Sequence, residues 1–299
     1  MRRFVILLGA VLLVGACTGR VKGVREIAMD IPGFVAMWDF GGENPLSALG
    51  NRGLTLEPVQ GIEPPTLEQE GPLSGQSLHF EGGEYLRIPF EQTGALNIQS
   101  GQVSVVAWIK WQKGQTGFVG GMWDESTQGG KRQYGLFVSL PHYNGQDAVC
   151  GHVSKTGKPT PPFPHSIDYS ASGQSVPDGQ WCTVGFTYDG KHIRSYLNGV
   201  FEERAPELIN HTTGFDGYPD GLVQCKNPYF FPDGLGCNGS DFTLGAVLVG
   251  GRPGNFFQGN IGGIAVYSRA LSDAEMLSLN QEVFEEDGMY SGTTMTRSI

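Results

Sequence analysis

The stretch "QVSVVAWIKWQ", residues 102–112, is the clearest β-strand in the sequence and decides the fold class. Successive side chains of a strand point to opposite faces of a sheet. One face would carry Val103, Val105, Ala107, Ile109 and Trp111, and the other would carry Val106, Trp108 and Lys110. A strand of this length and composition belongs inside a sheet, so we expect strand partners before and after it in the chain.

Shorter strand-like segments do flank it, separated by turns rich in Gly, Pro, Asn and Asp. They are residues 33–40, 77–80, 84–90, 117–123, 133–140, 147–154, 180–190, 192–199, 241–249 and 256–271. Asp189-Gly190 is typical of a tight hairpin turn. The one helix signal is a capping box formed by Ser272 and Glu275. The pattern predicts an all-β protein, a two-sheet antiparallel β-sandwich of the jelly-roll type with one short C-terminal helix.

The N-terminus has a different character from the rest of the chain. Arg2 and Arg3 precede the apolar run "FVILLGAVLLVGA", residues 4–16, which is too short to span a membrane but suits a signal peptide. The run ends in small residues before Cys17 and resembles the lipobox of bacterial lipoproteins. That resemblance implies that Cys17 becomes the acylated first residue of the mature protein. An ordinary secretory signal, with Cys17 incidental, is the alternative.

These features predict the organisation and the location of the chain. We expect a lipoprotein signal peptide over 1–16, a tether over 17–32, the jelly roll over 33–284 and a flexible tail over 285–299. The protein would be lipid-anchored in the cell envelope. Thr18, rather than an aspartate, follows the acylated cysteine, which favours the outer membrane or the cell surface over the inner membrane.

The charge of the chain limits its partners. The formal net charge is −10, and removal of the signal peptide would take two arginines with it. Such a surface disfavours nucleic acid and anionic lipid as ligands. The oligomeric state is not indicated by the sequence.

Four cysteines follow the predicted lipidation site: Cys150, Cys182, Cys225 and Cys237. An even number outside the cytoplasm predicts two disulfides, for which three pairings exist. Cys225–Cys237 would close a short loop, and Cys150–Cys182 would join two strands. Free buried thiols are the alternative. A zinc site is disfavoured because no paired CxxC spacing occurs.

Several segments together resemble the laminin G-like jelly roll of the concanavalin A-like lectin/glucanase superfamily. They are "FVAMWDF", "SGQSLHFEGGEYLRIP", "QVSVVAWIKW", "WCTVGFTYDGKHIRSYLNGV" and "FFQGNIGGIAVYSRALSDAEM", in the expected order. The resemblance implies two antiparallel sheets packed face to face, one of them concave. Gly262 stands where many members carry an aspartate, and "NPLSALGNRG" lacks the aspartate of calcium-binding members. No cofactor is evident, although Glu43 and Asn44 are compatible with Ca²⁺.

The sequence argues against familiar hydrolase chemistry. The glucanases of the superfamily carry a Glu-x-Asp-x-Glu run on one strand, and no such run occurs here; GxSxG and HExxH are absent as well. A metal or lyase site is the remaining enzymatic option. His142, His152 and His165 lie close together in sequence, and Tyr169 with Lys155 could assist proton abstraction from a uronic acid.

A binding site is a stronger hypothesis, and it centres on residues 155–170. Four prolines stiffen this long loop, which follows the strand-like "CGHVS" that carries His152. We expect loops 123–130, 141–146, 155–170 and 226–233 to surround the site. The candidate ligand-binding residues are Trp123, Asp124, Tyr143, His152, Phe163, His165, Asp168, Tyr169, Asn227 and Tyr229. The alternative for the loop is a lid over the core.

The sequence therefore predicts a surface lipoprotein that binds a polysaccharide or another glycan without cleaving it. Aromatic rings would stack on the C–H faces of sugars, and short polar side chains would bind their hydroxyls. Two alternatives stay open: a protein-interaction or adhesion module of the envelope, and a polysaccharide-degrading hydrolase or lyase.

Overall fold

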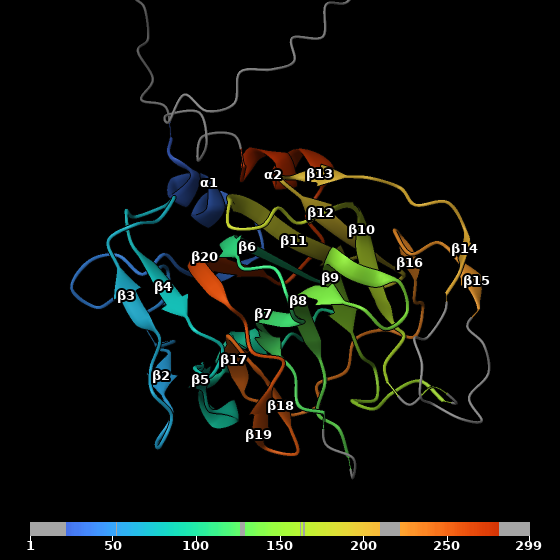
Figure 1. Cartoon of the computed structure of the whole chain (residues 1–299), viewed down its shortest axis with the longest axis horizontal. Helices are drawn as coiled ribbons and strands as arrows, with labels where there is room; N and C mark the ends of the chain where they lie inside the picture. The colour runs from blue at the N-terminus through green and yellow to red at the C-terminus, as the bar shows by residue number, and fades with distance from the viewer. Residues whose placement is uncertain are drawn as a thin grey trace, which may run out of the picture.

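Two large antiparallel sheets face each other in the computed structural model, which describes residues 22–51, 53–125, 129–161, 163, 165–209 and 222–280 (Figure 1). The first sheet contains β1 (Phe34–Trp38), β3 (Thr66–Glu68), β4 (Ser77–Phe80), β6 (Val103–Trp111), β11 (Trp181–Tyr188), β12 (His192–Leu197), β13 (Val200–Phe201), β16 (Tyr229–Phe230) and β20 (Gly259–Tyr267). Its order is β13-β12-β11-β6-β20-β4-β3, with β1 beside β20 and β16 beside β12.

The second sheet contains β2 (Glu57–Pro58), β5 (Leu86–Ile88), β7 (Gly117–Met122), β8 (Tyr134–Leu140), β9 (Gly145–Val153), β10 (Tyr169–Ser175) and β17 (Phe242–Leu244), in the order β10-β9-β8-β7-β17-β5-β2. Two small hairpins are β14 (Glu207–Leu208) with β15 (Val223–Gln224), and β18 (Val247–Val249) with β19 (Arg252–Gly254). Single 3₁₀ turns are η1 (Phe90–Gln92) and η2 (Gly94–Leu96). The predicted two-sheet sandwich is confirmed.

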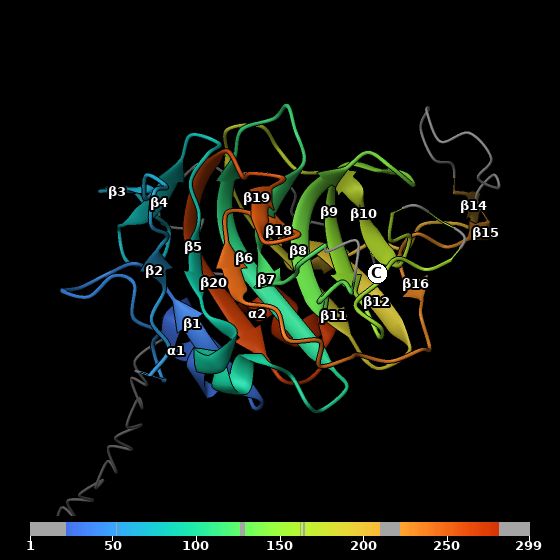
Figure 2. The same ribbon diagram turned by 90° about the horizontal axis from the view of Figure 1, so that it is seen from below.

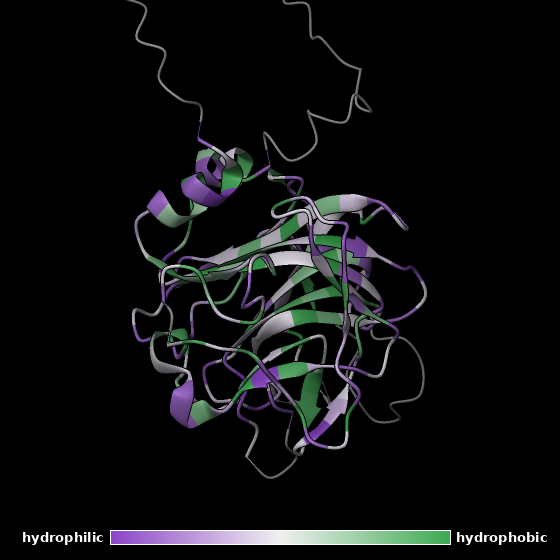
Figure 3. Cartoon of the chain, turned by 90° about the vertical axis from the view of Figure 1, so that its left-hand side faces the viewer, coloured by the Kyte–Doolittle hydropathy of each residue, from purple (hydrophilic) through white to green (hydrophobic). Residues whose placement is uncertain are grey.

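Strand β6 lies in the middle of the first sheet, and its two faces enter two different apolar clusters. The predicted inner face, from Val103 to Trp111, joins the large core between the sheets. On the outer face, Val106 and Trp108 join a second cluster under two short helices, α1 (Val24–Asp30) and α2 (Asp273–Ser278). Both helices lie on the outer side of this sheet (Figure 1), and Figure 3 shows apolar stretches in the strands of both layers. The predicted alternation along β6 is confirmed.

The helix ends show why these segments are helical. In α2 the hydroxyl of Ser272 accepts a hydrogen bond from Glu275 N, and the Glu275 side chain accepts one in return from Ser272 N, which confirms the predicted capping box. Helix α1 lies inside the segment predicted to be a tether. Its buried Val24 and Ala28 pack on the first sheet, so residues 24–30 belong to the folded unit.

Several predictions about the chain termini fall outside the described residues. These are the signal peptide, the acylation of Cys17 and the flexible tail. Within the part of the chain that the structure describes, neither helix has the length and apolar character needed to cross a membrane.

The predicted disulfides are absent, because all four cysteines of the fold are free thiols. Gly151 faces the first sheet, so its neighbour Cys150 points to the outer side of β9, where its thiol donates to Gly145 O. Cys182 pairs with Ile109 and faces the core. The two side chains therefore lie on different faces of different sheets and cannot be bridged.

Cys225 and Cys237 do not close a loop either. Cys237 is exposed and its thiol donates to Ile98 O, whereas Cys225 follows β15. An even cysteine count did not by itself indicate which side chains share a face of a strand.

We predict that Gly151→Ala destabilises the protein, because a Cβ at this position would lie 2.3 Å from the Cβ of Phe186 in the opposite sheet. Overpacking of this kind costs about 1–3 kcal/mol in the free energy of unfolding. Urea unfolding followed by fluorescence measures it. Gly83→Ala is the matched control, since a Cβ at that position would meet nothing within 4 Å. Equal stability of the two variants would contradict the packing described here.

Candidate functional site

A cavity of about 220 Å³ lies on the outer side of the second sheet. The orientation of β9 places it there: Gly151 faces Phe186 across the core, so the next residue, His152, points away from the first sheet. The described lining residues are Thr116, Glu125, Phe137, Leu140, His142, Tyr143, His152, His165, Ser166, Tyr169, Val249 and Asn255. Figure 2 shows the hairpin β18–β19, which contributes to this lining, in front of β7 and β8.

The floor of the cavity is aromatic and comes from three neighbouring strands. His152 of β9 pairs across the sheet with Tyr169 of β10, and the two ring centroids lie 5.3 Å apart. Phe137 of β8 lies 5.9 Å from the same imidazole. The Trp123 ring packs against the imidazole at a tilt, with ring centroids 4.3 Å apart. Gly135, the partner of His152 on β8, leaves the space that these rings fill.

His152 is the most unusual residue of the floor. Only 4% of its surface is exposed, and neither Nδ1 nor Nε2 has a hydrogen-bond partner. Burial, followed by the charges of Arg132 and Lys226, lowers its pKa well below the ordinary value. The ring is therefore neutral and presents one donor and one acceptor without a partner. A buried polar group in this state carries a desolvation cost that a ligand could relieve.

Ser166 is a second buried residue of the cavity whose polar group has no hydrogen-bond partner. Its hydroxyl is buried, with 7% of the residue exposed, and has no hydrogen-bond partner. His152 and Ser166 line the same cavity and together offer unsatisfied groups of both kinds. Buried polar groups in folded proteins are almost always satisfied, so two in one cavity make it a candidate binding site.

The turn between β8 and β9 forms one wall. Tyr143 and Asn144 have φ angles of 64° and 68°, in the left-handed region that a bulky side chain seldom adopts. This turn buries the Tyr143 ring, 5.7 Å from Phe163. The Tyr169 hydroxyl donates to the carbonyls of Leu140 and His142 and ties the turn to the floor. Backbone strain maintained by such packing is common at functional sites.

Glu125 and the hairpin β18–β19 form the opposite wall. Asp124 is joined to Leu248 by an isolated β-bridge, and its carboxylate accepts a hydrogen bond from Gly250 N. Glu125 N donates to Leu248 O, and the Glu125 carboxylate accepts from Trp123 Nε1 at 2.9 Å. Asp124 therefore positions the wall, while its neighbour Glu125 lines the cavity.

Three further charged side chains, Arg132, Asp168 and Lys226, lie near the cavity without lining it. The Arg132 guanidinium lies 5.8 Å from the Trp123 ring and 3.8 Å from Glu125 Oε2. The Lys226 Nζ lies 3.2 Å from the centroid of the Tyr169 ring, and burial lowers the Lys226 pKa well below its ordinary value. Burial raises the pKa of Asp168 to about 6, although the Thr160 hydroxyl donates to its carboxylate.

Four of the predicted ligand-binding residues line the cavity: Tyr143, His152, His165 and Tyr169. Three others support it from behind. Trp123 packs under His152, Phe163 packs on Tyr143, and Asp124 fixes the hairpin wall. Asp168 precedes Tyr169 and lies behind the wall, where Thr160 binds it.

Asn227 and Tyr229 are not part of the cavity, contrary to the sequence-based assignment. The Asn227 amide donates to Ser195 O and Glu202 O, and its oxygen accepts from Ser195 N, so every group is used in joining strands. Tyr229 is buried in β16, which pairs with β12. Loop 226–233 therefore closes the core rather than the site.

Only weak sequence signals point to the other lining residues. Glu125 and Ser166 adjoin predicted residues, and Phe137 lies in a predicted strand. Val249 ends a predicted strand, whereas Thr116 and Asn255 carry no pattern of their own; segments distant in sequence bring all three to the cavity.

The arrangement does not support the hydrolase or lyase alternatives. Glycoside hydrolysis requires two carboxyl groups, and Glu125 is the only carboxylate among the described lining residues. The Tyr169 phenol is engaged by two carbonyls, and burial raises its pKa well above the ordinary value. Lys155 does not line the cavity. Across the described residues, no group of three or more His, Cys, Asp or Glu side chains could hold a metal ion.

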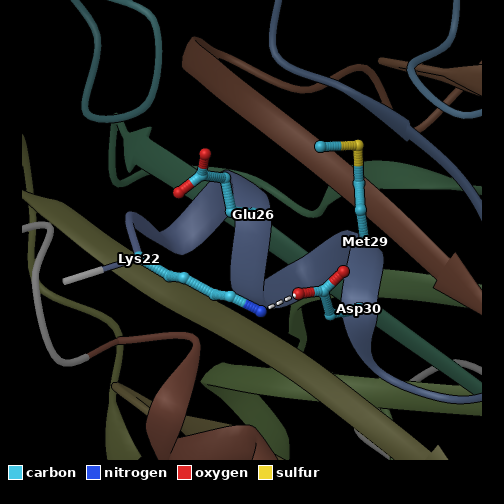
Figure 4. Close-up of a pocket in the computed structure, with 4 residues that line it drawn as sticks. All are labelled: Lys22, Glu26, Met29 and Asp30. Carbon is cyan, nitrogen blue, oxygen red and sulfur yellow. Dashed lines mark hydrogen bonds and ion pairs between the residues drawn. The ribbon is translucent and has the colours of Figure 1, made fainter. Parts of the chain in front are cut away.

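A second hollow lies beside α1 and is unsuited to a ligand (Figure 4). Lys22, Glu26, Met29 and Asp30 line it, all from one short segment. The Lys22 ammonium donates to the Asp30 carboxylate, and both side chains are mostly exposed. Exposed ion pairs of this kind contribute little energy.

We predict that Asp168→Asn stabilises the protein at neutral pH but not near pH 4. An aspartate in the unfolded chain titrates near 3.8, whereas folded Asp168 titrates at about 6. Between these values only the folded state holds the proton, so the contribution of Asp168 to the free energy of unfolding falls as the pH rises. The shift corresponds to on the order of 3 kcal/mol above pH 7.

Urea unfolding between pH 4 and pH 8 tests this expectation, with Glu91→Gln as a control at an exposed carboxylate. If the difference in the free energy of unfolding between wild type and Asp168→Asn does not change with pH, the raised pKa of Asp168 is ruled out.

Comparison with known proteins supports the fold. The most similar solved structures include domain 4 of AbnA, a GH43 extracellular arabinanase from Geobacillus stearothermophilus, in complex with arabinotriose. Its TM-score is 0.51 at 18% identity, and the match covers 83% of this chain and 98% of that chain. At this identity the likeness is one of fold.

Two other structures are more distant. One is the Ruminococcus gnavus IT-sialidase CBM40 bound to α2,3-sialyllactose, with a TM-score of 0.47, 15% identity, and coverage of 68% of this chain and 96% of that chain. The other is the Trypanosoma rangeli sialidase in complex with sialic acid, with a TM-score of 0.47 and 14% identity. The match covers 85% of this chain and 33% of that chain.

No similar sequence was found among curated proteins. In sequence, residues 80–218 of the chain match the laminin G-type family described as "Concanavalin A-like lectin/glucanases superfamily".

Proposed function

We propose that the protein is a lipid-anchored envelope protein that binds carbohydrate without cleaving it, through the cavity on the outer side of the second sheet. The observation that carries the proposal is His152, which is buried in the cavity with both ring nitrogens unpartnered. A sugar hydroxyl both donates and accepts hydrogen bonds, so two hydroxyls of one sugar ring could satisfy both nitrogens.

The rest of the lining suits the same ligand. Phe137, Tyr143 and Tyr169 supply apolar ring surface for the C–H groups of a sugar, and the hydroxyl of Ser166 supplies a further polar contact. Small-molecule sites commonly combine an aromatic lining with a few convergent polar groups in this way. The match of residues 80–218 to a family of lectins and glucanases agrees with a sugar ligand, as do the sugars in the complexes named above.

The proposed anchor follows from the N-terminal sequence. Arg2 and Arg3, the apolar run over 4–16 and the small residues before Cys17 match what a lipoprotein signal requires. Acylation of Cys17 would hold the sandwich at the cell surface, where polysaccharides are accessible. Residues 18–21 would join the lipid to the folded unit, which begins with α1.

We predict that His152→Phe abolishes glycan binding and leaves the fold intact. Phenylalanine retains the ring that packs on Trp123 but lacks the two nitrogens. The free energy of unfolding should be unchanged or higher, because two unsatisfied buried groups are removed. The measurement is binding of the purified full-length chain, in mild detergent, to an array of plant, bacterial and animal glycans.

His192→Phe is the matched control, since His192 lies on the first sheet, away from the cavity. Wild type and His192→Phe should bind the same glycans. Undiminished binding by His152→Phe would place the site elsewhere, and no binding by the wild type would favour a protein partner.

We predict that Cys17→Ser abolishes lipid attachment. Growth of the expressing bacterium with labelled palmitate should label the wild-type chain and should not label the variant, which is expected to leave the membrane fraction. Cys237→Ser, a change at an exposed thiol of the fold, is the control and should retain the label. Palmitate labelling of Cys17→Ser would contradict acylation at Cys17. It would not affect the proposal that the cavity binds carbohydrate.

A further inference from the structure

The wall of the cavity is tied together beside the turn between β8 and β9. The Thr116 hydroxyl donates to Ser139 O at 2.7 Å, which joins the loop before β7 to the end of β8. The Tyr169 hydroxyl donates to Leu140 O at 3.1 Å, which joins the end of β8 to β10.

Backbone hydrogen bonds hold the segments of the opposite side together. Phe118 N donates to Asn255 O at 2.9 Å, and Glu125 N donates to Leu248 O at 2.6 Å. The segment around the hairpin β18–β19 is thus held to β7 at one end and to the residues after β7 at the other. Gly250 N donates to the carboxylate of Asp124 and fixes the tip of the hairpin.

Charged and aromatic contacts connect the described segments of the remaining side. Arg132 lies 3.8 Å from Glu125 and donates to Gly157 O at 3.5 Å, which links the hairpin side to the proline-rich loop. Farther along that loop, the ring of His165 lies 5.1 Å from the ring of His142. This contact connects the proline-rich loop to the turn between β8 and β9.

The exposure of the lining follows the depth of the cavity. Phe137, His152 and Tyr169 are buried at the floor, whereas His165, Val249 and Asn255 are exposed at the rim. Among the described residues, the lining thus places a buried floor beneath an exposed rim. The end residue of a glycan chain can pass such a rim and reach the floor, whereas a polysaccharide bound along its length lies in an open groove. A volume of about 220 Å³ is below that of typical drug-sized sites and suits one sugar ring.

The charges of the lining select among sugars. Glu125 is the only carboxylate among the described lining residues, and no described Lys or Arg lines the cavity. Arg132, the nearest buried cation on that side, is already paired with Glu125 and lies over Trp123. A sugar carboxylate would therefore approach Glu125 in a partly buried site, where repulsion between like charges is strong.

We propose that the cavity takes a single uncharged sugar residue at the end of a glycan chain. This proposal rests on the carbohydrate-binding function proposed above, and it adds the charge of the ligand and its position in the chain.

Isothermal titration calorimetry at pH 7.5 tests the position in the chain. The probes are arabino-, xylo-, manno-, cello- and galacto-oligosaccharides of one to six residues. For each series that binds, we expect the affinity to reach its final value by the disaccharide and to change less than about threefold up to the hexasaccharide. An affinity that rises with each added residue would overturn chain-end binding.

The same instrument tests the charge preference with galacturonic acid oligomers against galacto-oligosaccharides of equal length. We expect the acidic series to bind at least about tenfold more weakly. Glu125→Gln keeps an acceptor for Trp123 Nε1 and removes the negative charge. It should therefore reduce the difference in affinity between the galacturonic acid series and the galacto-oligosaccharide series. Equal or tighter binding of the acidic series to the wild type would overturn the preference for uncharged sugars.

The outcomes separate this proposal from the broader one. An affinity that rises with the length of the oligosaccharide, or a preference for acidic sugars, contradicts only the present inference. Either result leaves carbohydrate binding in place. Failure of every neutral and acidic series to bind contradicts carbohydrate binding itself, and the present inference falls with it.

Discussion

The close approach of β9 to the first sheet at Gly151 is the constraint on which the site depends. A residue without a side chain at this point lets the β9 backbone lie against Phe186 of β11. Because side chains alternate along a strand, the contact turns Cys150 and His152 to the outer side of the second sheet. A strand with a larger residue at position 151 would hold the sheets apart. The packing of the core and the direction in which His152 points are therefore consequences of the same contact.

The outer side of the second sheet is organised around polar groups that the fold leaves unsatisfied. His152 and Ser166 have no hydrogen-bond partners although both are buried, and Tyr143 is held in a left-handed conformation. Each feature costs free energy, and the surrounding aromatic packing supplies the stability that maintains it. Arg132 and Lys226 are buried nearby over aromatic rings rather than facing the cavity. Cations are thereby kept out of the described lining, which agrees with a site for neutral, hydroxyl-rich ligands.

The sequence anticipated part of this site and missed the rest for identifiable reasons. His152 and Tyr169 were identified because a strand pattern runs into a loop too long and too rich in proline to be a simple connection. Strand β10 was not predicted, since "YSASGQS" has serine and glycine where strands usually carry branched or aromatic residues; it forms because β9 offers it an edge. Asn227 lies outside this cavity, and the sequence could not show it, because an asparagine in a loop looks the same in sequence whether it binds a ligand or holds strands together. The cysteine count could not indicate that Cys150 and Cys182 point to different faces.

By itself the sequence determined the sandwich, since alternation along residues such as Val103 to Trp111 is a local property that each strand expresses in its own side chains. The capping box of α2 is local in the same sense, and both were predicted correctly. Only the tertiary structure decided which side of the second sheet carries the site and what closes it. Thr116, Glu125, His165 and Asn255 become neighbours through hydrogen bonds and ring contacts between segments far apart in the chain. No local pattern encodes such contacts, because each depends on where the other segments are placed by the packing of the two sheets.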